Sequence, residues 1–432
     1  MKFNVRADIL ATLLRSGVEA STKSIIKNSS DIGKMTLDSQ KQCLKINAFG
    51  GHVGVVLKFD NINFDYLDYD CETPGKVTIG STDLVLALGS FEPGVVITIQ
   101  LNEDGSTKEL IIVNKNDDSE KQCMPVFDNE VNMPKIASTF DKNIKIRRDV
   151  FINSVNRVFF AVGFGELIPK FLYWILKTDK EKATFATGTG MRFMLLKLSG
   201  KDFIEVDGPQ NVMIHKDFTP LLISILNTGY SEFITIKQSS KNSISSNQTV
   251  IEYGTHIVVL VGFDSDMDWV DEDMIINSDK MCKFITKTSD WVYPMKGIRA
   301  TYSAENRKES IRHNMIGVLD KEAKQIEMET NELTKSKRKV SIGDFVDNGE
   351  DLYPFTFKCS SQYLSELPHY FDTGGFSQIE IMGPRKPIIV RDYASEKVSD
   401  KVERINDKTG LTEEYIMFFS VLLTEEEDEE ED

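Results

Sequence analysis

The chain has 432 residues, 41% hydrophobic and 27% charged, an ordinary globular composition with enough length for two or three domains. Its formal charge is −16, but the run EEEDEEED at residues 425–432 carries eight negative charges, and the remainder is mildly acidic at −8. Five cysteines lie far apart without zinc spacing, and no apolar run approaches the roughly 20 residues that cross a bilayer. These features argue against secretion and membrane insertion and favour the cytoplasm.

A recurring pattern begins at the amino terminus. Phe3-x-Val5 predicts a strand that leads into a Leu-rich helix, and VTIG, residues 77–80, reads as a strand. The segment IGSTDLVLALGSFEPGVVITIQ, residues 79–100, predicts a strand end, a helix capped by Ser81 or Thr82, a stop and a second strand. That second strand alternates through Ile97 and Ile99.

The same layout returns in the middle of the chain. Ile144-x-Ile146 predicts a strand before an amphipathic helix, and FLYWIL, residues 171–176, reads as a further strand. In IHKDFTPLLISILNTGYSEFITIK, residues 214–237, a second helix tolerates Pro220 because it falls in the first turn. The strand that follows alternates through Ile234 and Ile236.

A third copy follows, with a less clear beginning. KMCKFITKTSDWVY, residues 280–293, matches the strand and helix starts, and IRATYS, residues 298–303, reads as a strand. FKCSSQYLSELPHYFDTGGFSQIEIMG, residues 357–383, predicts a helix, a Gly374-Gly375 stop and a strand through Ile379 and Ile381. Two polar stretches, 331–352 and 393–414, are predicted as surface hairpins or loops.

The spacing of the Ile-x-Ile pairs defines the organisation of the chain. They begin at 97, 234 and 379, so the repeat lengths are 137 and 145 residues and three units account for all 432. We predict three similar domains at 1–138, 139–278 and 279–424 and an acidic tail at 425–432. Each domain is expected to be α+β, with two helices on antiparallel sheet. The pattern alone leaves a generic α+β array open.

Several segments resemble those of the bacterial DNA polymerase sliding clamp, the beta subunit of the replicative polymerase. They are the opening MKF-x-V, DVFINSVNRVFFAVG, FLYWILKT, ATFATGTGMRFMLLKL and the end EEYIMFFSVLL. The resemblance implies the DNA clamp fold, with a three-domain crescent that closes head to tail with a second copy around duplex DNA. It further implies a non-enzymatic processivity factor without cofactor or metal, whose partners are a DNA polymerase and a clamp loader.

In that family the helices line the hole, and basic residues on them face DNA. By position the resemblance implies DNA contact for Lys23, Lys27, Arg147, Arg148, Arg157, Lys216, Lys280, Lys283 and Lys287. The basic excess on these elements is concentrated in the second and third domains, whereas the second helices carry few cations. For any single residue, a solvated helix face stays an open alternative.

The resemblance also implies a hydrophobic cleft between the second and third domains for partner peptides of Gln-Leu-x-Leu-Phe character. Thr189, Gly190, Met191, Arg192 and Phe193 replace the family's T-D-G-H-R-L stretch, and the terminal strand contributes Met417, Phe418, Phe419 and Leu422. The walls would be completed by Phe171 or Tyr173, Val270, Ile275 and Pro387. The family's His, its Met-Pro-Met-Arg end and its interdomain Pro are absent, which leaves the peptide preference and an ordinary core role open.

Ring closure in the family would place Met124 opposite Trp291 and Val292, and exposed Trp and Met would suit an interface, although Trp291 could equally be a core residue. The acidic tail follows the strand beside the cleft, and we hypothesise that it screens the cleft or steers basic partners.

Two functions of other classes stay open. No GxSxG, Walker A or HxxxH pattern occurs, but the cluster Asp264, Asp266, Asp268, Asp271 and Asp273 could hold Mg²⁺ in a metal-dependent nuclease or phosphoesterase. A solvated loop is the competing interpretation of that cluster. The other alternative is a three-domain scaffold without any link to DNA.

Overall fold

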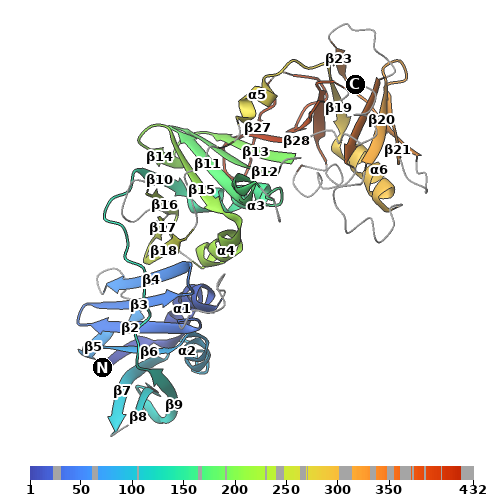
Figure 1. The fold of residues 1–432 in the computed structure, drawn as a ribbon. Helices are drawn as coiled ribbons and strands as arrows, with labels where there is room; N and C mark the ends of the chain where they lie inside the picture. Colours follow the sequence, from blue (N-terminus) through green and yellow to red (C-terminus); the bar gives the residue numbers. More distant parts are fainter. Residues whose placement is uncertain are drawn as a thin grey trace. The chain divides into compact units, whose positions relative to one another are not determined.

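A computed structural model describes residues 1–22, 31–60, 67–104, 107–163, 168–189, 192–228, 231–239, 248–262, 269, 271–300, 314–330, 337–347, 355–360, 371, 374–383, 386–399 and 401–419. Its helices are short and few beside its strands (Figure 1). In this part of the chain, no helix is both long and apolar enough to cross a bilayer.

In its described residues, the first repeat contains nine strands and two helices. In chain order they are β1 (Lys2–Arg6), α1 (Ala7–Thr22), β2 (Lys34–Gln40), β3 (Cys43–Phe49), β4 (Val53–Asp60), β5 (Asp70–Thr73), β6 (Gly75–Gly80), α2 (Ser81–Leu88), β7 (Val96–Asp104), β8 (Thr107–Asn114) and β9 (Asp117–Phe127).

The second repeat has the same order of elements, with two added 3-10 turns, η2 and η3. They are β10 (Lys142–Arg147), α3 (Arg148–Phe159), η2 (Pro169–Leu172), β11 (Tyr173–Asp179), β12 (Lys182–Gly188), β13 (Arg192–Ser199), β14 (Ile204–Val206), β15 (Gln210–His215), η3 (Lys216–Phe218), α4 (Thr219–Asn227), β16 (Phe233–Gln238), β17 (Gln248–Tyr253) and β18 (His256–Val261).

A short connecting helix, α5 (Glu272–Ile276), precedes the third repeat. That repeat contains β19 (Cys282–Lys287), α6 (Thr288–Ala300), β20 (Asn314–Asp320), β21 (Gln325–Thr330), β22 (Lys337–Ser341), β23 (Phe345–Asp347), β24 (Phe355–Ser360), β25 (Phe376–Ile381), β26 (Ile388–Tyr393), β27 (Arg404–Ile405) and β28 (Thr412–Phe419). Its predicted second helix lies almost entirely outside the described residues.

The chain forms two compact units. Unit 1 comprises Met1–Ile152 and Phe203–Met267, and unit 2 comprises Asn153–Asp202 and Asp268–Asp432. Unit 1 contains one sheet in the order β14-β10-β16-β17-β18-β4-β3-β2-β6-β9-β8-β7-β1-β5. Unit 2 contains the run β11-β12-β13-β28-β26-β25-β19-β23 and a separate sheet β22-β21-β20-β24. The boundaries of three domains stay a prediction, although β10 and β19 begin close to the predicted starts.

Strand register confirms the predicted α+β repeat. In each repeat the strand before the first helix pairs antiparallel with the strand that carries the Ile-x-Ile motif. Phe3 lies opposite Ile99, Ile144 opposite Ile236 and Phe284 opposite Ile379. All six side chains are buried. Alternating β-branched and aromatic residues place one face of each strand in the core, which fixes this common register.

Three local predictions need correction. The cap of α2 is Gly80 rather than Ser81 or Thr82, and the Ser81 hydroxyl instead accepts a 2.8 Å hydrogen bond from Ser21. The strand predicted at 298–303 is wrong at its start, because α6 continues to Ala300. Within the polar stretch 331–352, the predicted surface hairpin is present, since the mostly exposed β22 pairs antiparallel with β21, whereas β23 pairs with β19 and so corrects the loop alternative for its residues.

His256 is a buried histidine where the first and second repeats join in unit 1. It lies opposite Leu57 of β4, its ring stacks on Tyr253, and its Nε2 finds no hydrogen-bond partner in the described part of the chain. Burial lowers the pKa of His256 to about 4, from about 6.5 in an unfolded chain. Protonation of this ring therefore opposes folding.

We expect His256 to make the free energy of unfolding depend on pH between about 4 and 6.5. Because the unfolded chain binds the proton more readily, this contribution is complete above pH 6.5 and falls by about 3 kcal/mol as the pH drops to 4. Urea unfolding followed by circular dichroism at several pH values should show a flatter profile for His256→Phe than for the parent. Carboxyl groups titrate equally in both proteins, so parallel profiles would contradict the expectation.

Candidate functional site

Three phenylalanines form an aromatic cluster in unit 2. Phe193 of β13 lies directly opposite Phe418 of β28, and their rings stack at 4.9 Å between centroids with 18° between planes. Phe171 of η2 meets the Phe193 ring edge-on at 5.7 Å. Phe171 and Phe418 are buried, whereas Phe193 is partly exposed. The cluster therefore presents one aromatic face backed by two buried rings.

The hairpin between β12 and β13 positions Phe193. Gly188 lies opposite Phe193, and a Cβ at Gly188 would stand 2.4 Å from a carbon of that ring, so only glycine allows this approach. The turn is tied by Thr189, whose N–H donates to the Arg192 carbonyl at 2.7 Å and whose Oγ1 accepts from the Arg192 N–H at 3.1 Å. These contacts explain why a glycine stands at position 188 and a threonine at position 189.

Arg192 links this hairpin to the end of α3. Its Nη2 donates to the Phe160 carbonyl at 2.8 Å, and its guanidinium lies 5.5 Å from the Phe160 ring centroid. Both contacts join Arg192 to another residue of the same chain, so Arg192 helps to hold the hairpin that carries Phe193 against the end of α3.

The other residues predicted for the cleft are only partly brought together. Met417 is buried on the face of β28 opposite to Phe418, and Tyr173 is buried at the start of β11. Pro387 is half-buried just before β26, whose Ile388 pairs with Phe419, and Ile275 is half-buried on α5. Gly190, Met191, Val270 and Leu422 lie outside the described residues.

The three arginines predicted to face DNA have partners within the chain. Arg147 forms an ion pair with Asp149 at 2.6 Å, and Arg148 Nη1 donates to the Leu226 carbonyl at 3.2 Å. Arg157 pairs with Glu413 at 2.7 Å, and its guanidinium lies 4.4 Å from the centroid of the Tyr415 ring. No local sequence pattern indicates Glu413 as the partner of Arg157, because the two residues lie 256 positions apart.

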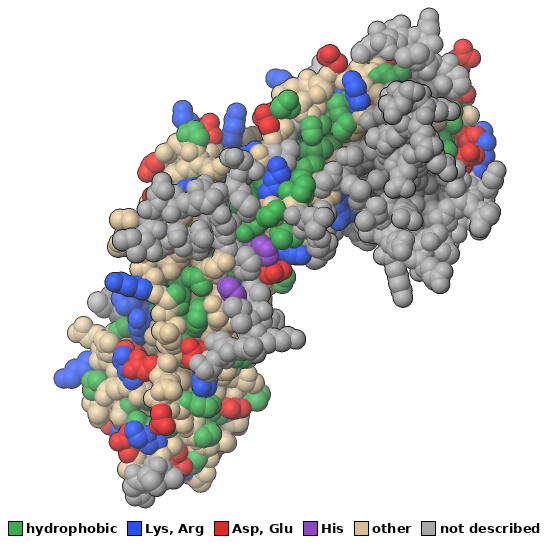
Figure 2. Space-filling model, in the orientation of Figure 1, with side chains coloured by type: hydrophobic (Ala, Val, Ile, Leu, Met, Phe, Trp, Pro, Cys, Tyr) green, Lys and Arg blue, Asp and Glu red, His purple; other side chains and the backbone are tan. Residues whose placement is uncertain are grey.

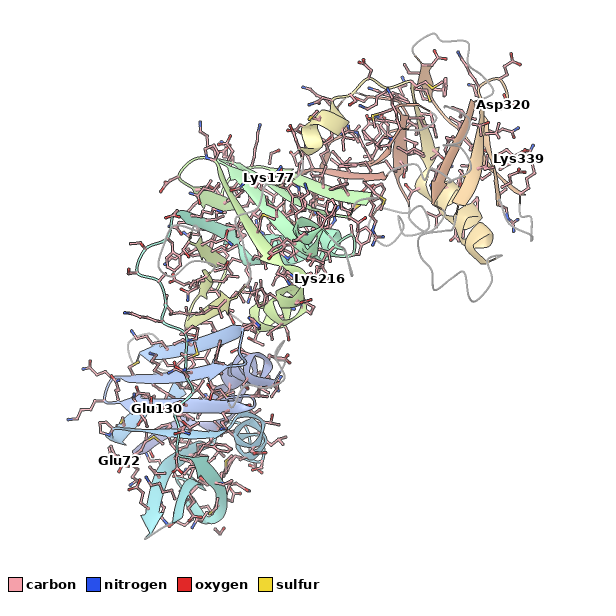
Figure 3. All side chains as sticks on the ribbon, in the orientation of Figure 1. Glu72, Glu130, Lys177, Lys216, Asp320 and Lys339 are labelled. Atoms are coloured by element: carbon pink, nitrogen blue, oxygen red, sulfur yellow. The ribbon has the colours of Figure 1, made fainter. Side chains whose placement is uncertain are left out.

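The predicted lysines are dispersed. Lys216 lies at the start of η3 and is half-buried (Figure 3). Lys280 donates to the Ile276 carbonyl at 2.8 Å, Lys283 lies on β19, and Lys287 is exposed at the end of that strand. Lys23 and Lys27 lie outside the described residues. Cations and carboxylates also alternate over the visible surface (Figure 2), so no strong basic patch emerges there.

The residues predicted for ring closure are buried rather than exposed, which corrects that expectation. Trp291 is 1% exposed, Val292 3% and Met124 6%. Met124 lies opposite the buried Leu110 of β8, and both residues of α6 are part of the core of the third repeat. Burial in the chain leaves these side chains unable to meet a second copy without repacking.

Two open sheet edges were missed by sequence reasoning. Residues 117–125 of β9 pair only with β8, because the pairing with β6 begins at Val126. β22 ends its sheet in the described part of the chain and pairs only with β21. Asp118 and Glu120 are exposed on β9, and Lys337 and Lys339 are exposed on β22. The two edges therefore carry opposite charge.

Both joints between repeats are formed by strands at equivalent positions in the repeat. The last strand of the second repeat, β18, pairs with β4 of the first, and the last strand of the third, β28, pairs with β13 of the second. By this rule β9, the last strand of the first repeat, and β22, the equivalent of β4 and β13 in the third, are the two strands left over.

Comparison with known proteins identifies the fold. No model of a known protein family matches the sequence, and no curated protein matches it. A DNA polymerase sliding clamp from Bacillus subtilis matches in structure with a TM-score of 0.73 at 14% identity, covering 98% of this chain and 99% of that one. The DNA polymerase III subunit beta from Pseudomonas aeruginosa gives 0.74 at 11%, covering 98% and 100%. A beta clamp from H. pylori gives 0.70 at 15%, with the same coverage. The chain has the sliding-clamp fold over its whole length.

Proposed function

We propose that this protein is a sliding clamp, a non-catalytic processivity factor that encircles duplex DNA and tethers a replicative DNA polymerase. The observation that carries this proposal is the match of all three repeats, in order, to sliding clamps from several bacteria. A tether raises the local concentration of polymerase at the primer end and turns rebinding into a local event. A clamp loader would open and close the ring in the cytoplasm.

Two copies would close the ring head to tail. The strands left over by the joint rule, β9 and β22, belong to opposite ends of the chain, so each copy offers β9 to the other's β22. Acidic β9 and basic β22 are complementary in charge, and an added strand supplies main-chain hydrogen bonds along both edges. Two identical joints of this kind make a closed dimer.

Such a ring would hold DNA by topology more than by direct affinity. The chain is net acidic, and Arg147, Arg148 and Arg157 are engaged within it. These three arginines are therefore less available to neutralise phosphates, and direct binding by a net acidic chain should be weak and salt-sensitive. Weak contact with the backbone suits a ring that must slide.

The aromatic cluster of Phe171, Phe193 and Phe418 would receive the apolar side chains of polymerase and loader peptides. Aromatic rings that are already backed by buried neighbours are preorganised anchors, and such sites concentrate binding energy.

The nuclease alternative gains no support from the acidic segment. Asp271 accepts a hydrogen bond from the Asp273 N–H at 3.2 Å and caps α5, and Asp273 lies 3.5 Å from Lys197. Asp264, Asp266 and Asp268 lie outside the described residues, and the residues that are described contain no group of three metal-ligating side chains.

Retention on circular DNA tests the proposal. The protein is diluted with nicked plasmid so that the rings open, and the mixture is then concentrated so that they close around the DNA. Gel filtration in 0.3 M salt separates plasmid-bound protein from free protein. Electron microscopy of the same sample should show two-chain rings. We expect coelution with the circle and loss of the protein when a restriction enzyme cuts the plasmid once. Equal retention on circular and linear DNA would contradict topological binding, and no retention would favour a scaffold. Cleavage of the plasmid that requires Mg²⁺ would favour the nuclease.

A further inference from the structure

A polar cavity of about 520 Å³ lies in unit 2, beside the segment that links α5 to β19. One wall is the end of that segment, from Ile276 to Lys280, and the other is the face of five adjacent strands, β13, β28, β26, β25 and β19. These strands contribute one charged side chain each to the wall. In sheet order they are Lys197, Glu414, Arg391, Glu380 and Lys283.

The floor of the cavity is a buried ion network of alternating charge. Arg391 Nε donates to Glu380 Oε1 at 2.9 Å, and Arg391 Nη1 donates to Glu414. The Arg391 and Glu380 side chains are only 7% and 4% exposed. Glu380 also accepts from Gln378 Nε2 at 2.9 Å. With both carboxylates held by Arg391, the floor offers little attraction to a cation.

Lysines surround this floor. Lys197 lies directly opposite Glu414 and Lys283 directly opposite Glu380 in the sheet, and Lys280 projects from the linking segment. Burial lowers the pKa of Lys280, and the nearby cations Arg391 and Lys283 lower it further against the opposite effect of Glu380. Four cations line the cavity against three carboxylates, the third being Asp279. Lys197 also lies 3.5 Å from Asp273 of α5, but this pair is solvent-exposed and contributes little, so the lining keeps one positive charge in excess. The cavity therefore favours an anionic group.

The cavity and the aromatic cluster lie on the same face of the same two strands. Side chains alternate along a strand, so Phe193 and Lys197 share one face of β13, and Phe418 and Glu414 share the same face of β28. The two positions are four residues apart in the sequence, which is roughly 13 Å along an extended chain. Leu195 and Ile416, which lie between them on this face, are 1% and 0% exposed, so other parts of the chain cover this stretch and a ligand that spans both points must pass over that cover.

We propose that the cavity is the anion-binding half of a two-point docking surface. Its ligand is a partner peptide with an apolar anchor on the aromatic cluster and a carboxylate, from Asp, Glu or the chain terminus, four to six residues away. The inference rests on the proposed function, since it assumes that the cluster receives peptides. Mixed recognition of this kind would give a divergent clamp its own partner preference, because a peptide without the carboxylate loses the ionic contact.

Fluorescence anisotropy with the full chain tests this. The probes are fluorescein-labelled peptides that contain Gln-Leu-Ser-Leu-Phe. In one set, Asp or its uncharged counterpart Asn stands five residues before or after Phe. In a second set, the peptide ends five residues after Phe, and its C-terminal carboxylate is either free or amidated. We expect a carboxylate to tighten binding about tenfold at low salt in at least one placement. Lys197→Glu should abolish that gain while leaving the Asn peptide unchanged, and Phe193→Ala should weaken both peptides alike.

Lys182→Glu is the matched control, because Lys182 is exposed on neighbouring β12 and carries the same change of charge outside the cavity. Thermal unfolding of each variant verifies the fold. Equal affinity for Asp and Asn peptides, with Phe193→Ala still harmful, would overturn the anion site and leave the proposed function standing. Failure of every peptide to bind would contradict a peptide-binding role for both the cluster and the cavity. Retention on circular DNA would still test the proposed function independently. If removal of residues 425–432 raised the affinity for acidic peptides only in the presence of Lys197, the chain's own tail would be the occupant and the assignment to a partner would be wrong.

Discussion

An equimolar mixture of two charge-reversed variants should form closed dimers that neither variant forms alone. One variant carries Asp118→Lys and Glu120→Lys on β9, and the other carries Lys337→Glu and Lys339→Glu on β22. In each variant by itself, both joints of the ring would oppose like charges. In the mixed dimer, one joint pairs two unaltered edges and the other pairs two reversed edges, so both are complementary.

The expected effect is large because every dimer contains the joint twice. If reversal costs roughly 1.4 kcal/mol at each joint, the dissociation constant of either pure variant rises about 100-fold. Analytical ultracentrifugation across a concentration series should give monomers for each variant and dimers for the mixture. Rising salt should weaken both the penalty and the rescue.

Two controls make the result specific. Lys337 and Lys339 both lie near Glu327, so thermal unfolding must show that the β22 variant keeps its fold. Such exposed pairs contribute little, and only a small change is expected. Reversal of the exposed Lys182 and Lys201, which lie on neither edge, should leave the dimer intact. Monomers in the mixture, with both variants folded, would show that β9 and β22 do not meet.

The repeat was predictable from the sequence because its signal is local. Alternation around Ile97, Ile234 and Ile379 places one face of each strand in a core, and the register of the strands confirms this. Phe171, Phe193 and Phe418 were named through a family resemblance, and the structure brings the three rings together.

What sequence reasoning missed depends on contacts between distant residues. Nothing near Arg157 indicates that Glu413 will neutralise it, and no local pattern shows that β9 is left without a second partner. The burial of Trp291 likewise depends on how α6 lies in its repeat, since an aromatic residue suits both a core and an interface. The ion network around Arg391 joins three strands and has no sequence signature.

Arg391→Ala should destabilise unit 2 by about 3–5 kcal/mol at pH 8. The substitution removes the guanidinium from between Glu380 and Glu414 and leaves buried carboxylates without their cation, which costs more than the ion pair contributes when intact. All three tryptophans, at positions 174, 269 and 291, belong to unit 2, so urea unfolding followed by tryptophan fluorescence reports on this unit.

The loss should shrink as the pH falls toward 5. Burial already raises the pKa of Glu414, and without Arg391, whose charge lowers that pKa, Glu414 would take up a proton in the folded state more readily than in the unfolded chain. A raised carboxyl pKa gives stability at low pH that disappears as the pH rises through the folded value. The triple variant Arg391→Met, Glu380→Leu and Glu414→Gln removes all three charges of the network, so it should cost far less than Arg391→Ala. A loss below about 1 kcal/mol for Arg391→Ala at pH 8 would mean that water reaches the network and that the cavity floor is not a fixed array of charge.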